Sequence, residues 1–228
     1  MGKNDNGNNG RTELVFVVDR SGSMGGLESD AIGGFNSMLS KQRTIAGECR
    51  ATTLLFDHRI ETLHNHLDIR EVNDLTSRDY WVRGSTALLD AIGLAIDRMI
   101  VTQRHTAAAY RAQHVLFVII TDGYENASRR YSLHQIKQMI TYERERYHWE
   151  FVFLGANIDA EQTAGDFGIS PRCATDFHAD GQGIKASFEA VACAATAVRG
   201  GADLEDLNAP DFLGGVRDDY RSRRRMKR

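Results

Sequence analysis

The sequence predicts an α/β protein with a doubly wound, mostly parallel, Rossmann-like sheet, helices on both faces and one antiparallel edge hairpin. Three observations lead to this prediction. Residues 14–19 (LVFVVD) and 115–120 (VLFVII) are continuous apolar runs rich in β-branched residues, as expected for strands buried on both faces of a sheet. Segments with apolar residues at helical spacing follow strand-like runs along the chain, which is typical of α/β folds. A tight connection at Asp57-His58 joins two strand-like runs and predicts the hairpin.

The expected elements follow one another in a regular order. After the first strand, apolar residues from Leu27 recur at intervals of three and four, so an amphipathic helix is expected to about Arg43. Parallel pairing of the strands then requires right-handed crossovers through the helices. The remaining expected elements are strands at 51–57 and 59–69, a helix over 88–100, a strand at 115–120, a helix over 133–140, a strand at 150–154, a short helix near 160–167, a weak strand near 173–178 and an Ala-rich helix over 183–198.

Composition divides the chain into three parts. Residues 1–12 are polar and rich in Gly and Asn, and we expect a flexible N-terminal tail without the apolar segment of a secretory signal. Residues 13–200 carry the α/β pattern and are long enough for one domain of ordinary size. Residues 201–228 form a C-terminal extension with a basic tail. No apolar run approaches the roughly 18–20 residues that a membrane span needs, so no span is expected.

The net charge of −3 is unevenly distributed along the chain. The last eight residues, RSRRRMKR, hold six basic side chains, which leaves 22 basic against 31 acidic side chains in the rest. A basic tail of this kind indicates contact with nucleic acid, acidic partners or a membrane surface. A solvated, disordered end is the simpler interpretation and the one that we expect. Association with nucleic acid through this tail is kept as an alternative function.

The three cysteines, Cys49, Cys173 and Cys193, are an odd number and lie far apart. A disulfide framework is therefore not expected, and we predict reduced, mostly buried thiols. This cysteine usage favours a cytoplasmic location.

Polar residues follow two of the predicted buried strands, at the edge where sheets of this kind place their ligands. Asp19, Ser21 and Ser23 come at the end of the first strand in FVVDRSGSMG, Thr86 begins a helix in RGSTALLDAIG, and Asp122 ends the strand VLFVII. Two carboxylates and three hydroxyls offer only oxygen ligands, which suit Mg²⁺, Mn²⁺ or Ca²⁺ better than zinc. With so few anionic donors, water must fill the remaining positions, which fits Mg²⁺.

These three segments together resemble the metal-ion-dependent adhesion site (MIDAS) of von Willebrand factor A (VWA) domains. The resemblance lies in Asp-x-Ser-x-Ser, Gly-Ser-Thr-Ala-Leu and Thr-Asp-Gly, and in pattern it covers about 13–199. It implies that Ser21, Ser23 and Thr86 ligate the metal directly, and that Asp19 and Asp122 do so directly or through water. The wording DRSGSM, GSTALLDAI and TDGYEN is similar to small intracellular bacterial or phage VWA proteins, which implies a role beside AAA+ ATPases.

The resemblance implies a metal-dependent protein–protein binding module rather than an enzyme. If both carboxylates stand one water away from the cation, the cation keeps most of its charge and attracts an Asp or Glu of a partner protein. Neighbouring residues are candidates for the rim of the partner-binding face: Gly22, Met24, Ser85, Tyr124, Glu125 and Asn126.

Other interpretations stay open. Taken alone, the Asp-x-Ser-x-Ser loop is equally well explained as a turn that caps the next helix. Asp19 after a strand also resembles the aspartyl nucleophile of haloacid-dehalogenase-like phosphatases, although Ser21 stands where that family has a second acid, so a metal-dependent hydrolase is an alternative. Finally, His64, His66 and Asp68 would share one face of a regular strand, which makes a nuclease or zinc site a further candidate.

Overall fold

The computed structural model of the protein describes residues 10–226, with side chains as far as residue 224. Within this part, six strands form one sheet in the order β3-β2-β1-β4-β5-β6, and every neighbouring pair is parallel except β2 and β3. The predicted fold class and the antiparallel edge hairpin are therefore confirmed. The strands are β1 (Thr12–Asp19), β2 (Cys49–Phe56), β3 (Ile60–Asp68), β4 (His114–Asp122), β5 (Glu150–Ala156) and β6 (Ala174–Asp176).

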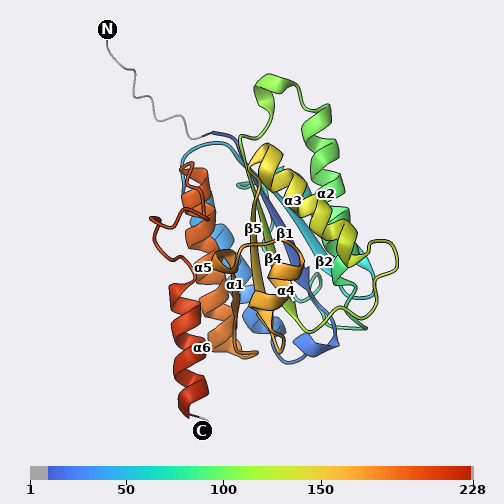
Figure 1. The fold of residues 1–228 in the computed structure, drawn as a ribbon, viewed down its shortest axis with the longest axis vertical. Helices are drawn as coiled ribbons and strands as arrows, with labels where there is room; N and C mark the ends of the chain where they lie inside the picture. Colours follow the sequence, from blue (N-terminus) through green and yellow to red (C-terminus); the bar gives the residue numbers. More distant parts are fainter. Residues whose placement is uncertain (1–9, 227–228) are drawn as a thin grey trace.

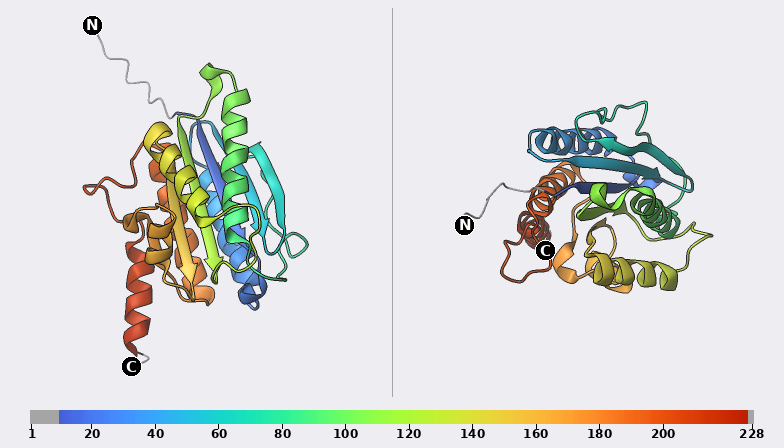
Figure 2. Two further views of the ribbon diagram at one scale, coloured as in Figure 1. Left: turned by 45° about the vertical axis from the view of Figure 1, so that its right-hand side comes forward. Right: turned by 90° about the horizontal axis from the view of Figure 1, so that it is seen from above.

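Helices cover both faces of this sheet. Figures 1 and 2 show α1, α5 and α6 on one face and α2 and α3 on the other. The α-helices are α1 (Glu28–Arg43), α2 (Leu88–His105), α3 (Leu133–Tyr147), α4 (Ala160–Asp166), α5 (Gly181–Arg199) and α6 (Gly214–Met226), and short 3-10 turns occur at η1 (Gly22–Met24), η2 (Ala108–Tyr110) and η3 (Pro171–Cys173).

Aromatic side chains join a central strand to the helices on one face of the sheet and join two strands on the other. On one face, the ring of Phe16 in β1 lies edge-on to Phe35 of α1, with ring centroids 5.3 Å apart, and Phe35 in turn contacts Phe188 of α5. On the other face, Phe117 of β4 stacks on Phe151 of β5, with a centroid distance of 4.9 Å. Each ring buries a large apolar area, so these contacts fix the central strands whose ends carry the polar loops.

The C-terminal segment differs from its prediction. A disordered end is wrong for the described part, because residues Gly214–Met226 form α6 and pack beside α5 and β6. Val216 is buried, Arg217 donates to three backbone carbonyls next to β6, and Arg223 pairs with Asp180. These two arginines are therefore used inside the fold. Residues 227–228 and the first nine residues of the expected N-terminal tail lie outside the described part.

The prediction that the polar residues of β3 share one face is also wrong. A β-bulge interrupts the pairing of β3 with β2, and His66 there has a left-handed backbone with φ 54°. His64 Nδ1 lies 3.1 Å from Thr53 Oγ1, whereas His66 Nδ1 lies 2.8 Å from Glu13 Oε1. Thr53 pairs with Phe16 of β1, so His64 lies on the face of the sheet that Phe16 shares. Glu13, the neighbour of His66, comes three residues before Phe16, and residues three apart in a strand point to opposite faces. The two histidines therefore lie on opposite faces. In residues 10–226, no group of three His, Cys, Asp or Glu side chains could hold a metal.

Cys49, Cys173 and Cys193 are unpaired, and the first two are buried while the third is exposed. Within the described residues, none of the helices combines the length and the apolar character that crossing a membrane requires.

Candidate metal centre

The polar loops meet where the order of the strands reverses. The chain passes from β1 to β2 on one side of the sheet, and β4 pairs with β1 on the other side, so a crevice opens at the carboxyl ends of these two strands. Asp19 is the last residue of β1 and Asp122 the last residue of β4. Thr86 lies two residues before the start of α2.

The loop after β1 folds back over its own carboxylate. Asp19 Oδ1 accepts a hydrogen bond of 2.6 Å from the backbone N–H of Ser21, and the hydroxyl oxygens of Ser21 and Ser23 lie 3.0 Å apart. The 3-10 turn η1 follows Ser21 directly, and its Met24 is fully buried. The alternate-residue spacing of this motif therefore brings the two hydroxyls to the same place above Asp19.

Backbone hydrogen bonds fasten the Thr86 loop to the other two loops. The Gly22 N–H donates to the Gly84 carbonyl at 3.1 Å. The Thr86 N–H donates to Asn126 Oδ1 at 2.8 Å, and the Asn126 N–H donates back to the Thr86 carbonyl at 3.0 Å. The three segments that are distant in sequence are thus one connected structure.

Gly123 shows how closely the hydroxyls approach the β4 loop. A Cβ at this position would lie 3.5 Å from Ser23 Oγ and 3.9 Å from Thr86 Oγ1, and the backbone φ of 148° is one that side-chain-bearing residues rarely adopt. The hydroxyls of Ser23 and Thr86 therefore lie beside the backbone directly after Asp122. The structure brings together all five residues that the sequence selected as metal ligands.

The two carboxylates are bonded in different ways. Asp19 is fully buried, and its Oδ2 accepts from Thr121 Oγ1 at 2.8 Å and from the Asp122 N–H at 3.2 Å, so both of its oxygens have protein donors. Asp122 Oδ1 accepts from Asn157 Nδ2, but its Oδ2 is buried without a hydrogen-bond partner in the protein. A buried, unpaired carboxylate oxygen is costly, so this atom calls for a cation or water.

The pKa shifts of the two carboxylates also favour a cation at this place. Burial raises the pKa of Asp122, the Asn157 hydrogen bond lowers it, and the nearby charge of Asp19 raises it further. Burial also raises the pKa of Asp19, against the lowering effect of its hydrogen bonds from Ser21, Thr121 and Asp122. A cation between two such carboxylates would reverse these shifts, because it favours the ionised forms. The donor set of two carboxylates and three hydroxyls therefore fits a hard divalent ion.

Three residues that hold Asp19 and Asp122 in place are not among those predicted from the sequence. Thr121 and Asn157 bond Asp19 and Asp122 as described above, and the buried Tyr80 hydroxyl donates to the Asp19 carbonyl at 2.5 Å. Thr121 directly precedes Asp122, so its position in TDG was a usable signal. No spacing pattern points to Asn157 or Tyr80, because Asn157 lies 35 residues from Asp122 and Tyr80 lies 61 residues from Asp19.

The predicted rim is only partly at the surface. Gly22, Ser85, Tyr124 and Asn126 are exposed, and Glu125 is half-buried. Met24 is wrong as a rim residue, because its fully buried side chain belongs to the core beneath η1. Glu125 also has a structural task, since its carboxylate accepts from the Leu89 N–H of α2 at 2.9 Å.

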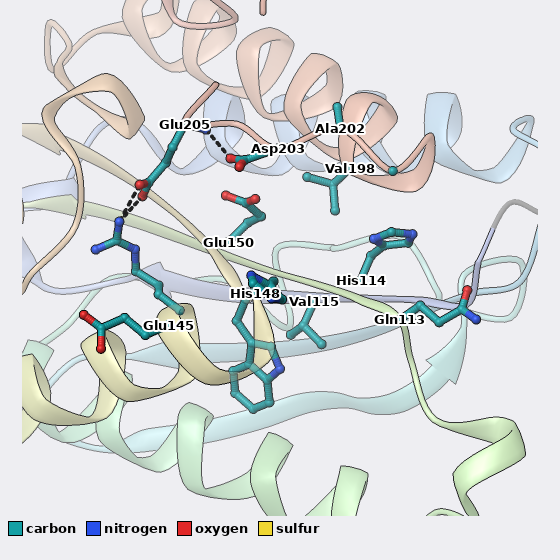
Figure 3. A pocket seen from close by; sticks show the side chains of 13 residues that line it. Gln113, His114, Val115, Glu145, His148, Glu150, Val198, Ala202, Asp203 and Glu205 are labelled. Carbon is teal, nitrogen blue, oxygen red and sulfur yellow. Dashed lines mark hydrogen bonds and ion pairs between the residues drawn. The ribbon is translucent and has the colours of Figure 1, made fainter. Parts of the chain in front are cut away.

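A second acidic region lies at the opposite end of the strands (Figure 3). It is a cleft of about 500 Å³ at the amino ends of β4 and β5, lined by Glu150, Asp203 and Glu205 among others. Glu205 is paired with Arg144. Burial and the neighbouring Asp203 raise the pKa of Glu150 to about 7. None of the five residues of the candidate metal centre lines this cleft.

No family model matches the chain, and no curated protein matches it. Solved structures with a similar fold include proximal thread matrix protein 1 from the mussel byssus (14% identity, 82% of this chain and 46% of that chain, TM-score 0.55) and a von Willebrand factor type A protein from Catenulispora acidiphila (10%, 80% and 42%, 0.53). A further structure is the manganese-loaded TRAP protein of Plasmodium vivax (15%, 78% and 72%, 0.53). One structure of the mussel protein has a zinc-occupied MIDAS motif.

These likenesses identify the fold. The chain has the mostly parallel sheet and flanking helices of VWA domains, as the sequence motifs implied. It spans less than half of the length of the mussel and Catenulispora proteins. At identities of 10–15%, the zinc and manganese named for the mussel and Plasmodium structures are reported for those proteins.

Proposed function

We propose that this protein is a metal-dependent protein–protein binding module. Ser21, Ser23, Thr86 and Asp122 would hold a divalent cation, and the cation would accept an Asp or Glu side chain of a partner as a further ligand. The observation that carries the proposal is Asp122 Oδ2, a buried carboxylate oxygen without a hydrogen-bond partner in the protein, directly before the glycine beside which the hydroxyls of Ser23 and Thr86 lie.

Asp19 has a different part in this proposal. Because both of its oxygens already accept hydrogen bonds from the protein, it would act on the ion through water and fix the Ser21 loop. Only Asp122 would then place a free carboxylate oxygen near the ion, so much of the positive charge would remain for the partner's carboxylate. Mg²⁺ or Mn²⁺ fits a site with so few protein anions better than Ca²⁺, which takes six to eight oxygen ligands.

Two observations count against the alternative functions. A nucleophilic aspartate needs an accessible oxygen, whereas Asp19 is fully buried and bonded at both oxygens, which disfavours a hydrolase. Nucleic-acid binding through the C-terminus loses part of its basis because Arg223, one of the six basic residues of the tail, pairs with Asp180 of the fold. The unpaired and exposed Cys193 is consistent with a reducing, cytoplasmic location. The proposed role beside AAA+ ATPases rests on the motif resemblance.

Calorimetric titration with Mn²⁺ tests this function directly. Wild type should give saturable binding, and the double variant Ser21→Ala/Asp122→Ala should lose it. Ser85→Ala is the matched control, because this exposed hydroxyl lies next to Thr86 but is not one of the proposed ligands.

A pull-down from the native host in Mg²⁺ or EDTA, with wild type and the double variant, then reports the partner. Capture that depends on Mg²⁺ and on the ligand set supports the proposal. Absence of divalent binding together with EDTA-insensitive capture contradicts it.

A further inference from the structure

A groove of about 380 Å³ begins at the candidate metal centre and runs between the start of α2, the start of α3 and the helix α4. Its walls include the buried side chains of Leu88, Ile158 and Phe167. Two large apolar side chains beside them are open to solvent, since Leu133 is 43% exposed and Tyr124 is 61% exposed. This volume is at the lower end of the range of pockets that bind small groups, and it can hold one large apolar side chain.

The groove is continuous with the metal centre. Gly123 lines it, and the same residue lies beside the hydroxyls of Ser23 and Thr86. Leu88 comes two residues after Thr86, and Ile158 directly follows Asn157, whose amide holds Asp122. An extended chain covers about 3.3–3.6 Å per residue, so a segment with its carboxylate at the metal reaches the groove within one to three residues.

Charge along the groove limits what can enter it. The residues that line it include three acids and no base. Asp159 and Asp166 are exposed at the two ends of α4, and the carboxylate of Asp159 also caps that helix through the Gln162 N–H at 2.9 Å. A second acidic residue of the partner would be repelled here, whereas a basic residue would be attracted.

We propose that the groove takes an apolar side chain from the same partner segment that gives its carboxylate to the metal. The inference rests on the proposed function and specifies the partner: an extended segment with one Asp or Glu, a Leu-, Ile- or Phe-type residue one to three positions away, and a Lys or Arg beyond it toward Asp159 or Asp166.

Selection from a library of random peptides displayed on phage tests this specificity. The full chain is immobilised in Mn²⁺, and bound phage are released with EDTA. Released peptides should contain an acidic residue with an apolar residue at a fixed short offset, enriched over the input library. Replacement of that apolar residue by Ala in the synthetic peptide should raise the Kd of the peptide about tenfold. Burial of a Leu-, Ile- or Phe-type side chain contributes at least the binding free energy that corresponds to a tenfold change in Kd.

Leu133→Glu is the variant that separates the groove from the metal. It places a charge in the groove at an exposed position in the first turn of α3, where an acid is tolerated. Leu133→Glu should abolish the preference for an apolar residue in the peptide while Mn²⁺ binding stays unchanged. The control is His134→Glu, one residue further along and outside the groove, which should keep the apolar preference.

Two results would overturn the groove inference and leave the proposed function intact. One is that wild type selects peptides with an acidic residue but without a preferred apolar residue. The other is that Leu133→Glu selects the same apolar residue as wild type. If EDTA releases no peptide, the proposed function fails and this inference fails with it.

Discussion

Carboxylates lie at both ends of the central strands, and the two ends hold them differently. At the carboxyl end, Asp122 is fully buried, with one oxygen bonded to Asn157 and the other without a protein partner. At the amino end, Glu150 is only half-buried in an open cleft, and the neighbouring Glu205 is neutralised by Arg144 (Figure 3). The amino end has the larger cleft, but the carboxyl end has the unpaired carboxylate oxygen.

This contrast separates an acidic cluster from the candidate metal centre. Glu150 can relieve the cost of its surroundings by taking up a proton, since its pKa is raised to about 7. At the carboxyl end, the hydroxyls of Ser23 and Thr86 lie beside Gly123, which directly follows Asp122, and the Ser21 hydroxyl lies next to that of Ser23. These oxygens can ligate a cation without adding negative charge. Neutral oxygen donors beside one unpaired carboxylate oxygen are therefore more informative than the number of acids.

The largest expected effect comes from exchanging one charge at each end. Asp122→Asn keeps the shape of the side chain but removes the anion, and it should weaken Mn²⁺ binding about 100-fold or more. Glu150→Gln is the matched change at the amino end and should leave Mn²⁺ affinity unchanged. Calorimetric titration of both variants checks this, and equal losses would abolish the distinction between the two ends.

A smaller effect is expected from the residue that supports Asp122. Asn157 has a left-handed backbone with φ 54°, which Gly adopts without strain, so Asn157→Gly removes the amide and keeps the turn. Loss of this second-layer hydrogen bond should weaken Mn²⁺ binding about 10- to 100-fold.

His148 has the same φ of 54° at the amino end, so His148→Gly is the backbone control. It should bind Mn²⁺ as wild type does. A similar loss in both variants would mean that the backbone, and not the Asn157 amide, is responsible.

The smallest expected effect is on stability at the amino end. The pKa of Glu150 rises from its ordinary 4.5 to about 7 on folding. Between these values the unfolded chain loses the proton while the folded chain keeps it, so stability falls as the pH rises from 4.5 to 7 and then levels off. Glu150→Gln should remove this dependence and stabilise the fold at pH 8 by about 1–2 kcal/mol, after allowance for partial exposure. Urea unfolding at pH 5 and pH 8 measures it, and an unchanged pH profile would contradict it.

The sequence was sufficient for the central strands and for the grouping of the five proposed ligands because both leave local signals. Apolar runs predict β1 and β4, and parallel strands at a switch point bring Asp19 and Asp122 together without any detail of packing. The signal for Thr86 was its place at the start of a helix.

The features that could not be predicted from the sequence depend on contacts between residues that are distant along the chain. The helix α6 is rich in arginine and depends on contacts such as Arg217 with the backbone next to β6, which no periodicity predicts. The bulge at His66 follows from the register of β3 against β2, and it reversed the predicted face of that side chain. The role of Asn157 cannot be predicted from the sequence either, because its hydrogen bond to Asp122 forms only when β4 and β5 lie side by side.

The most direct test of the central claim is the position of a bound ion. Crystals of the protein grown or soaked in Mn²⁺ give an anomalous difference map that locates the metal without reference to any assumed ligand. We predict a peak beside Asp122 Oδ2 and the hydroxyls of Ser21, Ser23 and Thr86. A map with no peak there, or with its peak in the cleft around Glu150, would contradict the assignment of the metal centre to the carboxyl end of the sheet.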